Sequence, residues 1–168
     1  MEPPKKLIED HNYVITIDPT VLVAAFRPKK LVVDANIVFS ALSTRTFTFE
    51  LIRLLHAKGV RLYSPQYIHE ELADKTPKLL EYSGLSRDEL GLLLKVVFSQ
   101  IDTMPKEEYT ACMTEAEKLI KDHLEDVPYL ALALKLDCPV WSNERRLAKL
   151  KEVKTIPTHK LKRMFGVE

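Results

Sequence analysis

The sequence predicts an α/β fold, namely a three-layer α/β/α sandwich with a parallel core sheet and an N-terminal β-hairpin extension. From residue 31 onward, short apolar runs alternate with longer amphipathic stretches, as strands alternate with helices in a parallel sheet. The first run, Leu31 to Val33, is continuously apolar and ends at an aspartate, which is typical of a strand buried on both faces. A chain of 168 residues suits one main domain. We therefore assign residues 1–30 to the extension and 31–168 to the domain.

The N-terminal extension is expected to contain two strands. Residues 1–12 are polar and include two prolines, which predicts a loose tail. Runs rich in β-favouring residues follow at 13–17 and 21–26, and a turn-favouring Asp-Pro-Thr joins them at 18–20. We expect these two runs to pair as a hairpin.

The domain is expected to alternate strands and helices to its end. Core strands are expected at 31–33, 61–63, 101–104, 139–141 and 153–156. Helices are expected at 36–58 with a break near 43–44, from 64, at 77–83, 86–99, 106–121 and 126–136, from about 143, and from 158. Ser64-Pro65 is a favourable helix start, and Ser86 with Glu89 has capping-box spacing.

Composition places the chain among globular proteins, with 46% apolar and 29% charged residues. No apolar run is long enough for a membrane span, and the N-terminus lacks the apolar stretch of a secretory signal, so we expect a cytoplasmic protein without a membrane partner. Cys112 and Cys138 stand apart, and the histidines are scattered. These spacings do not indicate a zinc site.

Charge is distributed unevenly although the net charge is only +1. The stretch from Arg145 to Arg163 holds eight Lys or Arg residues against Glu152 alone, whereas Lys106 to Asp126 holds seven acids against three bases. A basic face beside an acidic cluster would suit a phosphate backbone lying across a metal site. Two solvated helix faces explain the same pattern, and the sequence leaves both interpretations open.

Four acids stand at or near the positions where sites form, just past the carboxyl ends of parallel strands. These acids are Asp34, Glu71, Asp126 and Glu144. Gathered carboxylates repel each other unless cations occupy the cluster, and Mg²⁺ prefers oxygen ligands. In phosphoryl chemistry such an ion lowers the pKa of a bound water. The pattern therefore indicates a site for Mg²⁺ or Mn²⁺.

Each acid also has an ordinary structural explanation. Asp34 and Asp126 stand where helix caps are expected, the latter before a first-turn proline. Glu144 suits the first turn of a helix, where the helix dipole favours an acid. Glu71 follows Glu70 and suits a solvated helix surface.

The joint arrangement of four segments resembles the PIN-domain family, in its VapC-like and archaeal ribonuclease members. The resemblance covers about residues 31–165 and rests on LVVDANIVFSAL, SPQYIHEEL, DVPYLALALKLDCPVWSNERRL and IPTHKLKRMFG, in that order. It implies that Asp34, Asp126 and Glu144 hold the metal and that Glu71, favoured over Glu70, ligates it or orients the attacking water. Where the family usually has Asp, the fourth position here is Glu144.

The same resemblance implies supporting roles for neighbours of these acids. Asn36 and Ser142 would orient the carboxylates, and Asn143 is a substitute candidate for the fourth ligand. Arg145 and Arg146 are candidates for contact with the RNA backbone, and a solvated helix start explains them equally.

The resemblance implies a divalent-metal-dependent endoribonuclease that leaves 5′-phosphate and 3′-hydroxyl ends. Such nucleases act as toxins restrained by an antitoxin protein or in RNA processing, and a homodimer is expected. A PIN-like module that binds RNA or protein without hydrolysis is the alternative, because a fold does not guarantee activity. A haloacid-dehalogenase-like phosphatase needs Asp-x-Asp, and Asn36 stands at its third position. A phosphoacceptor receiver needs an acidic pair that this chain lacks.

Overall fold

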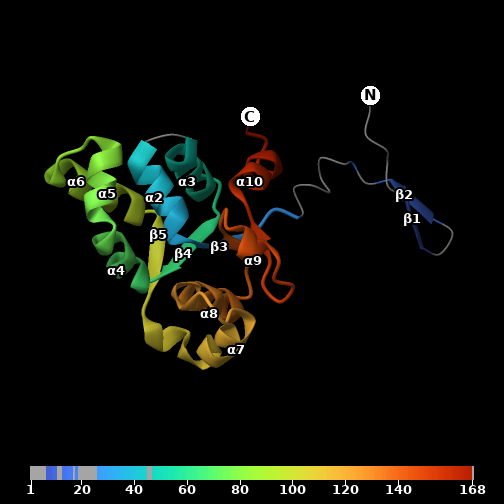
Figure 1. Cartoon of the computed structure of the whole chain (residues 1–168). Coiled ribbons are helices and arrows are strands. Elements are labelled where there is room, and N and C mark those ends of the chain that lie inside the picture. Colours follow the sequence, from blue (N-terminus) through green and yellow to red (C-terminus); the bar gives the residue numbers. More distant parts are fainter. Residues whose placement is uncertain (1–6, 11–12, 17, 19–25, 45–46, 168) are drawn as a thin grey trace. The chain divides into compact units, whose positions relative to one another are not determined.

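The computed structural model describes residues 7–10, 13–16, 18, 26–44 and 47–167 (Figure 1). Contacts between residues divide the chain into two units. Pro28–Thr158 form the larger unit, and Met1–Arg27 with His159–Glu168 form the smaller one. The domain boundary expected after residue 30 remains a prediction.

The larger unit contains a parallel five-stranded sheet in the order β5-β4-β3-β6-β7. Its strands are β3 (Lys30–Val33), β4 (Arg61–Pro65), β5 (Ile101–Met104), β6 (Val140–Trp141) and β7 (Thr155–Ile156). β3 is central, and its register pairs Val32 with Tyr63 of β4 on one side and with Val140 of β6 on the other. The parallel core sheet expected from the apolar runs is confirmed.

Helices cover both faces of this sheet, as Figure 1 shows. On one face, α8 (Val127–Leu136) contacts β3, β4 and β6, and α7 (Met113–Leu119) packs on α8. On the other, α3 (Phe47–Ala57) contacts β4 and α6 (Arg87–Phe98) contacts β5. α2 (Ala35–Thr44) packs against α3, α6, α4 (Tyr67–Asp74) and α5 (Thr76–Ser83). The three-layer α/β/α arrangement is therefore confirmed.

The core lies along the inner strands of the sheet. Leu31, Val32 and Val33 are fully buried, as expected for a strand with helices on both faces. Trp141 of β6 is also fully buried, and its indole N–H donates to Thr158 Oγ1 over 3.0 Å. This hydrogen bond satisfies the polar end of a large core side chain.

Two details of the expected elements are wrong. Ser64 and Pro65 do not start a helix but end β4, where buried Ser64 donates to the carbonyl of Val33 over 3.0 Å. The helix expected over 106–121 is divided into η1 (Lys106–Glu108), η2 (Thr110–Cys112) and α7. In contrast, the break between α2 and α3 and the capping box of Ser86 with Glu89 are confirmed. The short helix α9 (Arg145–Ala148) follows β6.

The smaller unit contains a hairpin whose pairing differs from the expected one. β1 (Leu7–Asp10) pairs with β2 (Tyr13–Thr16), so the strand expected at 13–17 is present. Its partner, however, is the segment Leu7–Asp10, which lies in the part of the chain expected to be a loose tail. Of the other expected strand, at 21–26, residues 21–25 lie outside the described residues.

The C-terminal residues of the smaller unit belong mainly to α10 (Thr158–Met164), which begins at the expected residue. Nε of Arg27 donates to the carbonyl of Met164 over 2.6 Å, and its guanidinium lies over the ring of Phe165. Across the described parts of the chain, no helix has the length and apolar character needed to cross a bilayer.

Candidate active site

The carboxyl ends of β3 and β6 bring Asp34 and Ser142 together. The backbone N–H of Asp34 donates to the carbonyl of Trp141 over 3.1 Å, which continues the strand pairing by one residue. Ser142 Oγ then donates to Asp34 Oδ2 over 2.6 Å and also accepts from the backbone N–H of Glu144 over 3.1 Å. One buried hydroxyl therefore orients the first acid and the turn that carries the fourth.

Asp34 is an acid in an unfavourable environment, with only 4% of its surface exposed. Burial is the main cause that raises its pKa, and the hydrogen bond from Ser142 opposes that rise. The charges of Asp126 and Glu144 raise the pKa further. Three of the four expected acids are thus close enough to repel each other electrostatically.

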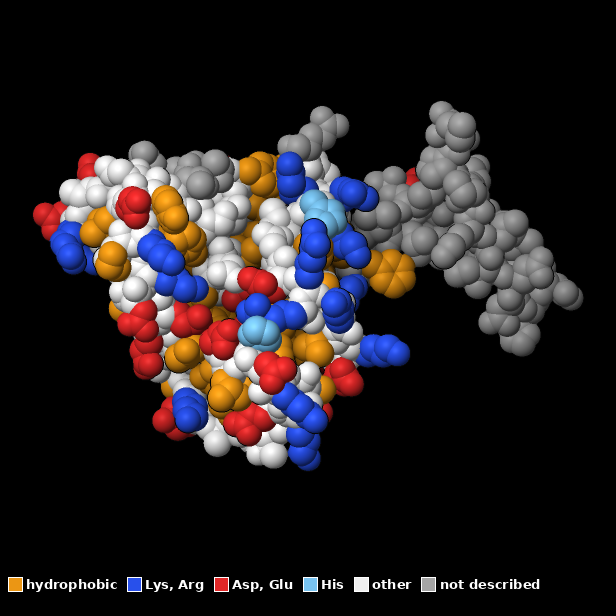
Figure 2. Space-filling view, in the orientation of Figure 1, with side chains coloured by type: hydrophobic (Ala, Val, Ile, Leu, Met, Phe, Trp, Pro, Cys, Tyr) orange, Lys and Arg blue, Asp and Glu red, His pale blue; other side chains and the backbone are white. Residues whose placement is uncertain are grey.

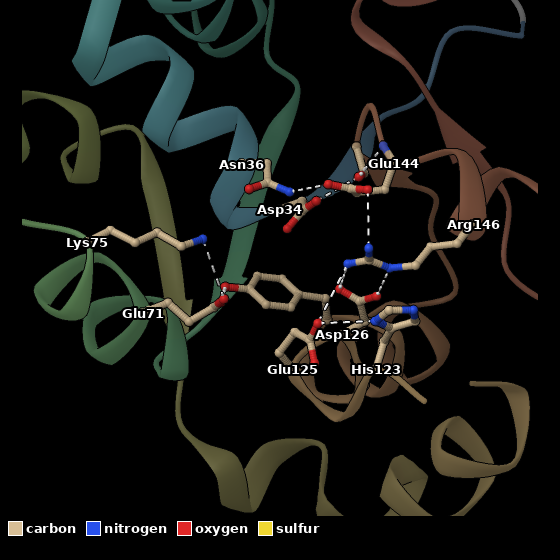
Figure 3. Close-up of polar contacts among 11 residues, drawn as sticks. Asp34, Asn36, Glu71, Lys75, His123, Glu125, Asp126, Glu144 and Arg146 are labelled. Carbon is tan, nitrogen blue, oxygen red and sulfur yellow. Dashed lines mark hydrogen bonds and ion pairs between the residues drawn. The ribbon is translucent and has the colours of Figure 1, made fainter. Parts of the chain in front are cut away.

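Asn36 connects the start of α2 with Glu144. Its Nδ2 donates to Glu144 Oε1 over 2.6 Å, and Figure 3 shows the two side chains directed toward each other above Asp34. Asn36 and Glu144 therefore lie in the same cluster as Asp34.

The guanidinium of Arg146 lies inside the acidic cluster, between Glu144 and Asp126 (Figure 3). Nε is 2.7 Å from Asp126 Oδ2, and Nη2 is 3.3 Å from Asp126 Oδ1, so the contact with Asp126 is bidentate. Nη1 is 3.4 Å from Glu144 Oε2. Glu125, which also accepts from His123, lies 3.8 Å from Nη2. These carboxylates, with the hydrogen bond to Asp126 as the largest cause, raise the pKa of Arg146.

Glu71 approaches the cluster from α4 and is held by two partners. The hydroxyl of Tyr129 donates to Glu71 Oε2, and the Lys75 ammonium lies 4.0 Å from Oε1. Burial raises the pKa of Glu71, these partners lower it, and the charges of Asp34 and Asp126 raise it again. The neighbouring Glu70 is exposed. Glu71 is therefore the glutamate directed toward the cluster.

Two expected site residues do not join this cluster. The side chain of Asn143 accepts from the backbone N–H of Thr158 over 2.9 Å, at the start of α10. Arg145 is exposed on α9. Helical spacing explains the difference, because neighbouring residues on a helix point in different directions, so only one arginine of the pair can face the acids.

Sequence reasoning missed four contributors, namely Lys75, His123, Glu125 and Tyr129. Lys75 stands four residues after Glu71, a spacing that suggests an ion pair on a helix. Tyr129 lies within an apolar run that gives no sign of a polar role, and it is 1% exposed. Burial raises its pKa, and the carboxylate of Glu71 raises it further, so its hydroxyl stays protonated as a donor.

A hollow of about 530 Å³ lies beside the cluster rather than within it. Its lining includes Glu70 and Glu125, which are the sequence neighbours of two site acids, and also Tyr67 and Tyr109. Figure 2 shows acidic side chains gathered over α4 and the segment below it on this face. The surroundings of the cluster are therefore themselves acidic on the α4 side.

The chemistry of the three acids in the cluster fits a hard divalent cation, since Asp34, Asp126 and Glu144 all offer carboxylate oxygens. As the side chains stand, no group of three or more His, Cys, Asp or Glu residues in the described ranges is arranged to hold a metal ion. Arg146 engages Asp126 and Glu144 and provides their counter-charge. The three acids are therefore of a type that binds a divalent ion, and in this structure the charges of Asp126 and Glu144 are balanced by Arg146.

Comparison with known proteins gave a family match and a structural match. A family model described as PIN domain matches residues 32–164. The chain is similar to a chain in the crystal structure of VapBC2 from Rickettsia felis bound to a DNA fragment from their promoter. The TM-score is 0.56 with 15% sequence identity, covering 76% of this chain and 98% of that one. No curated protein matches the sequence.

Proposed function

The chain belongs to the PIN-domain family, and on that premise we propose that it is a divalent-metal-dependent endoribonuclease that hydrolyses RNA phosphodiester bonds. Members of this family are generally nucleases that use divalent ions. The observation that carries the proposal is the convergence of Asp34, Asp126 and Glu144 at the carboxyl end of the sheet. Burying like charges together costs stability, so their presence favours a site selected for function.

Asp34, Asp126 and Glu144 would hold the ion, which is Mg²⁺ or Mn²⁺ in this proposal. When bound, such an ion supplies a lowered pKa for coordinated water and neutralises charge on the phosphate. Ser142 and Asn36 hold the carboxylates of Asp34 and Glu144 in fixed orientations through their hydrogen bonds. This support is the kind that raises the affinity of a site for its ligand.

Glu71 is proposed to accept a proton from the attacking water. Its raised pKa brings it closer to the range in which a carboxylate acts as a general base, and Tyr129 fixes its orientation. Water adds to phosphorus and gives a proton to Glu71, the bond between phosphorus and the 3′ oxygen breaks, and that oxygen takes up a proton from solvent. The products would carry 5′-phosphate and 3′-hydroxyl ends.

Arg145 and Arg146 are the candidates for contact with the RNA backbone. Arg145 is exposed on α9, next to the acidic cluster in sequence. A guanidinium that neutralises one phosphate adds about 0.7 to the slope of log affinity against log salt for a single strand.

The proposed partners are based on the family and on the similar solved structure. Family members of the VapC-like type act as toxins restrained by an antitoxin, and the similar solved structure is of VapBC2. We therefore propose an antitoxin protein as a partner and a homodimer as the assembled form, acting in the cytoplasm. A role in RNA processing is the other use of the same chemistry.

The test is cleavage of a mixed single-stranded RNA pool with Mn²⁺, with EDTA and with Asp34→Asn. We expect cutting with Mn²⁺ and a loss of at least about a hundredfold in both controls. Asp102→Asn is the matched variant, because Asp102 is an exposed acid on β5 paired with Arg61. It should cut like the wild type.

One observation favours a second candidate function, a PIN-like module that binds RNA or protein without hydrolysis. Arg146 already provides a counter-charge to Asp126 and Glu144, so these two carboxylates are compensated without a metal. Intact RNA that is nevertheless retarded on a gel in the presence of Mn²⁺ would decide for this module.

A further inference from the structure

We propose that Arg146 is the resident cation of the carboxylate cluster and that it sets the affinity of the cluster for divalent ions by competing with them. This inference rests on the proposed function, since it concerns the same site. It gives Arg146 a role separate from contact with RNA. Its consequence is that removing the guanidinium strengthens metal binding.

The competition follows from the oxygens that Arg146 engages. Its bidentate contact takes one lone pair from each carboxylate oxygen of Asp126, at 2.7 Å and 3.3 Å. At Glu144, Oε2 faces Nη1 of Arg146 and Oε1 accepts from Asn36. Two of the three proposed ligands are therefore engaged by the same guanidinium. A divalent ion at these oxygens and the guanidinium in its present position would also repel each other strongly at such short range.

Charge compensation gives the second argument. Among the described side chains in contact with the four acids, Lys75 lies beside Glu71, and Arg146 bridges Asp126 and Glu144. A guanidinium keeps its charge throughout the physiological pH range. It must therefore move out, rather than deprotonate, when a divalent ion takes its place.

The position of Arg146 in the fold allows this movement. It lies on α9, a helix of four residues, and its side chain is 33% exposed. Burial of the adjacent Leu147, at 1% exposed, holds the helix while the arginine side chain rotates. Rotation of an exposed side chain is fast and leaves the core undisturbed. A displaced guanidinium remains tethered beside the cluster, where a phosphate of bound RNA would meet it.

The experiment is titration of chelator-treated protein with Mn²⁺ alone, followed by calorimetry and by the Mn²⁺ electron paramagnetic resonance signal. Arg146→Gln removes the resident charge, and Arg145→Gln removes the same charge from the exposed neighbour on the same helix. We expect Arg146→Gln to lower the Kd for Mn²⁺ on the order of tenfold. Arg145→Gln should leave the Kd close to that of the wild type.

Thermal unfolding provides a readout independent of the titration. In EDTA, Arg146→Gln should melt below the wild type, because Asp126 and Glu144 lose their counter-charge. Saturating Mn²⁺ should raise its Tm by more than it raises that of the wild type. Arg146→Lys, which keeps a charge but not the fork, should bind Mn²⁺ with a Kd between those of the wild type and Arg146→Gln. Arg146→Lys also keeps the inference testable if Arg146→Gln does not fold.

The outcomes separate this inference from the proposed function. Equal or weaker Mn²⁺ binding by folded Arg146→Gln, with a wild type that binds, overturns the inference and leaves the nuclease proposal standing. Binding by Arg146→Gln and not by the wild type supports the inference and contradicts metal-dependent activity of the natural chain. Absence of binding in every variant overturns both.

Discussion

The amide of Asn36 donates a hydrogen bond of 2.6 Å to Oε1 of Glu144, across 108 positions of sequence. The longer side chain of Glu144 reaches this amide from the turn after β6. We expect Glu144→Asp to bind Mn²⁺ about tenfold more weakly, because the shortened carboxylate loses its orienting partner.

The control for this prediction is Asn36→Ala, which removes the partner and keeps the glutamate. Calorimetric titration should show a similar loss of Mn²⁺ affinity in both variants. If Glu144→Asp binds Mn²⁺ as tightly as the wild type, the amide has no orienting role and the glutamate is merely a tolerated substitution.

Tyr129 and Glu71 allow stability and activity to be separated. Tyr129→Phe removes the donor to a partly buried carboxylate, which should lower the free energy of unfolding by about 1 to 3 kcal/mol. Glu71→Gln keeps an acceptor for the hydroxyl but cannot accept a proton as a base, so it should retain more stability while losing RNA cleavage. Urea unfolding and a cleavage assay on the same preparations check both statements. Equal stability of Tyr129→Phe and the wild type would contradict the first.

Asn143 is expected to matter for stability and not for metal binding. Its side chain accepts a hydrogen bond from the backbone N–H of Thr158. This N–H lies in the first turn of α10, where backbone N–H groups have no partner within the helix. Asn143→Ala should cost about 0.5 to 1 kcal/mol of unfolding free energy, as measured in urea. Its Kd for Mn²⁺ should equal that of the wild type. A weakened Kd at unchanged stability would restore Asn143 as a ligand candidate.

Cys138 provides a pH-dependent test of packing. Burial raises the pKa of its thiol from the ordinary value of 9.0 to about 11, and only the thiolate reacts with disulfide reagents. At pH 8 we expect the half-buried Cys112 to react with a coloured disulfide reagent well before Cys138. The reaction of Cys138 should accelerate as the pH approaches 11.

The same shift has a consequence for stability. Because the folded-state pKa of Cys138 lies above the unfolded value, the thiol holds its proton more tightly in the native state. Its contribution to stability is complete below pH 9 and is lost as the pH rises through about 11. Cys138→Ala should show a smaller loss of unfolding free energy than the wild type over this pH window. Identical slopes for the two proteins would show that the thiol is not shielded.

Local sequence patterns were sufficient to predict most strands and helices of the larger unit and to place the acids after strands. A continuous apolar run indicated β3, and the spacing of Ser86 and Glu89 indicated the start of α6. These signals succeed because periodicity and capping depend on neighbours a few positions apart. Once the strands are known, their parallel pairing places the residues that follow them at one edge of the sheet. Asp34 and Glu144, which follow two of these strands, were therefore expected at the same edge.

Which side chains meet at this edge depends on how distant segments pack in the folded chain. Nothing local distinguishes Arg145 from Arg146, yet one is exposed and the other bridges Asp126 and Glu144. Nor does an apolar run reveal that the hydroxyl of Tyr129 holds Glu71, 58 positions away. The direction of a side chain at the end of a strand or on a short helix depends on packing between distant segments. Local patterns carry no information about that packing, and it decides whether a charge faces water or another charge.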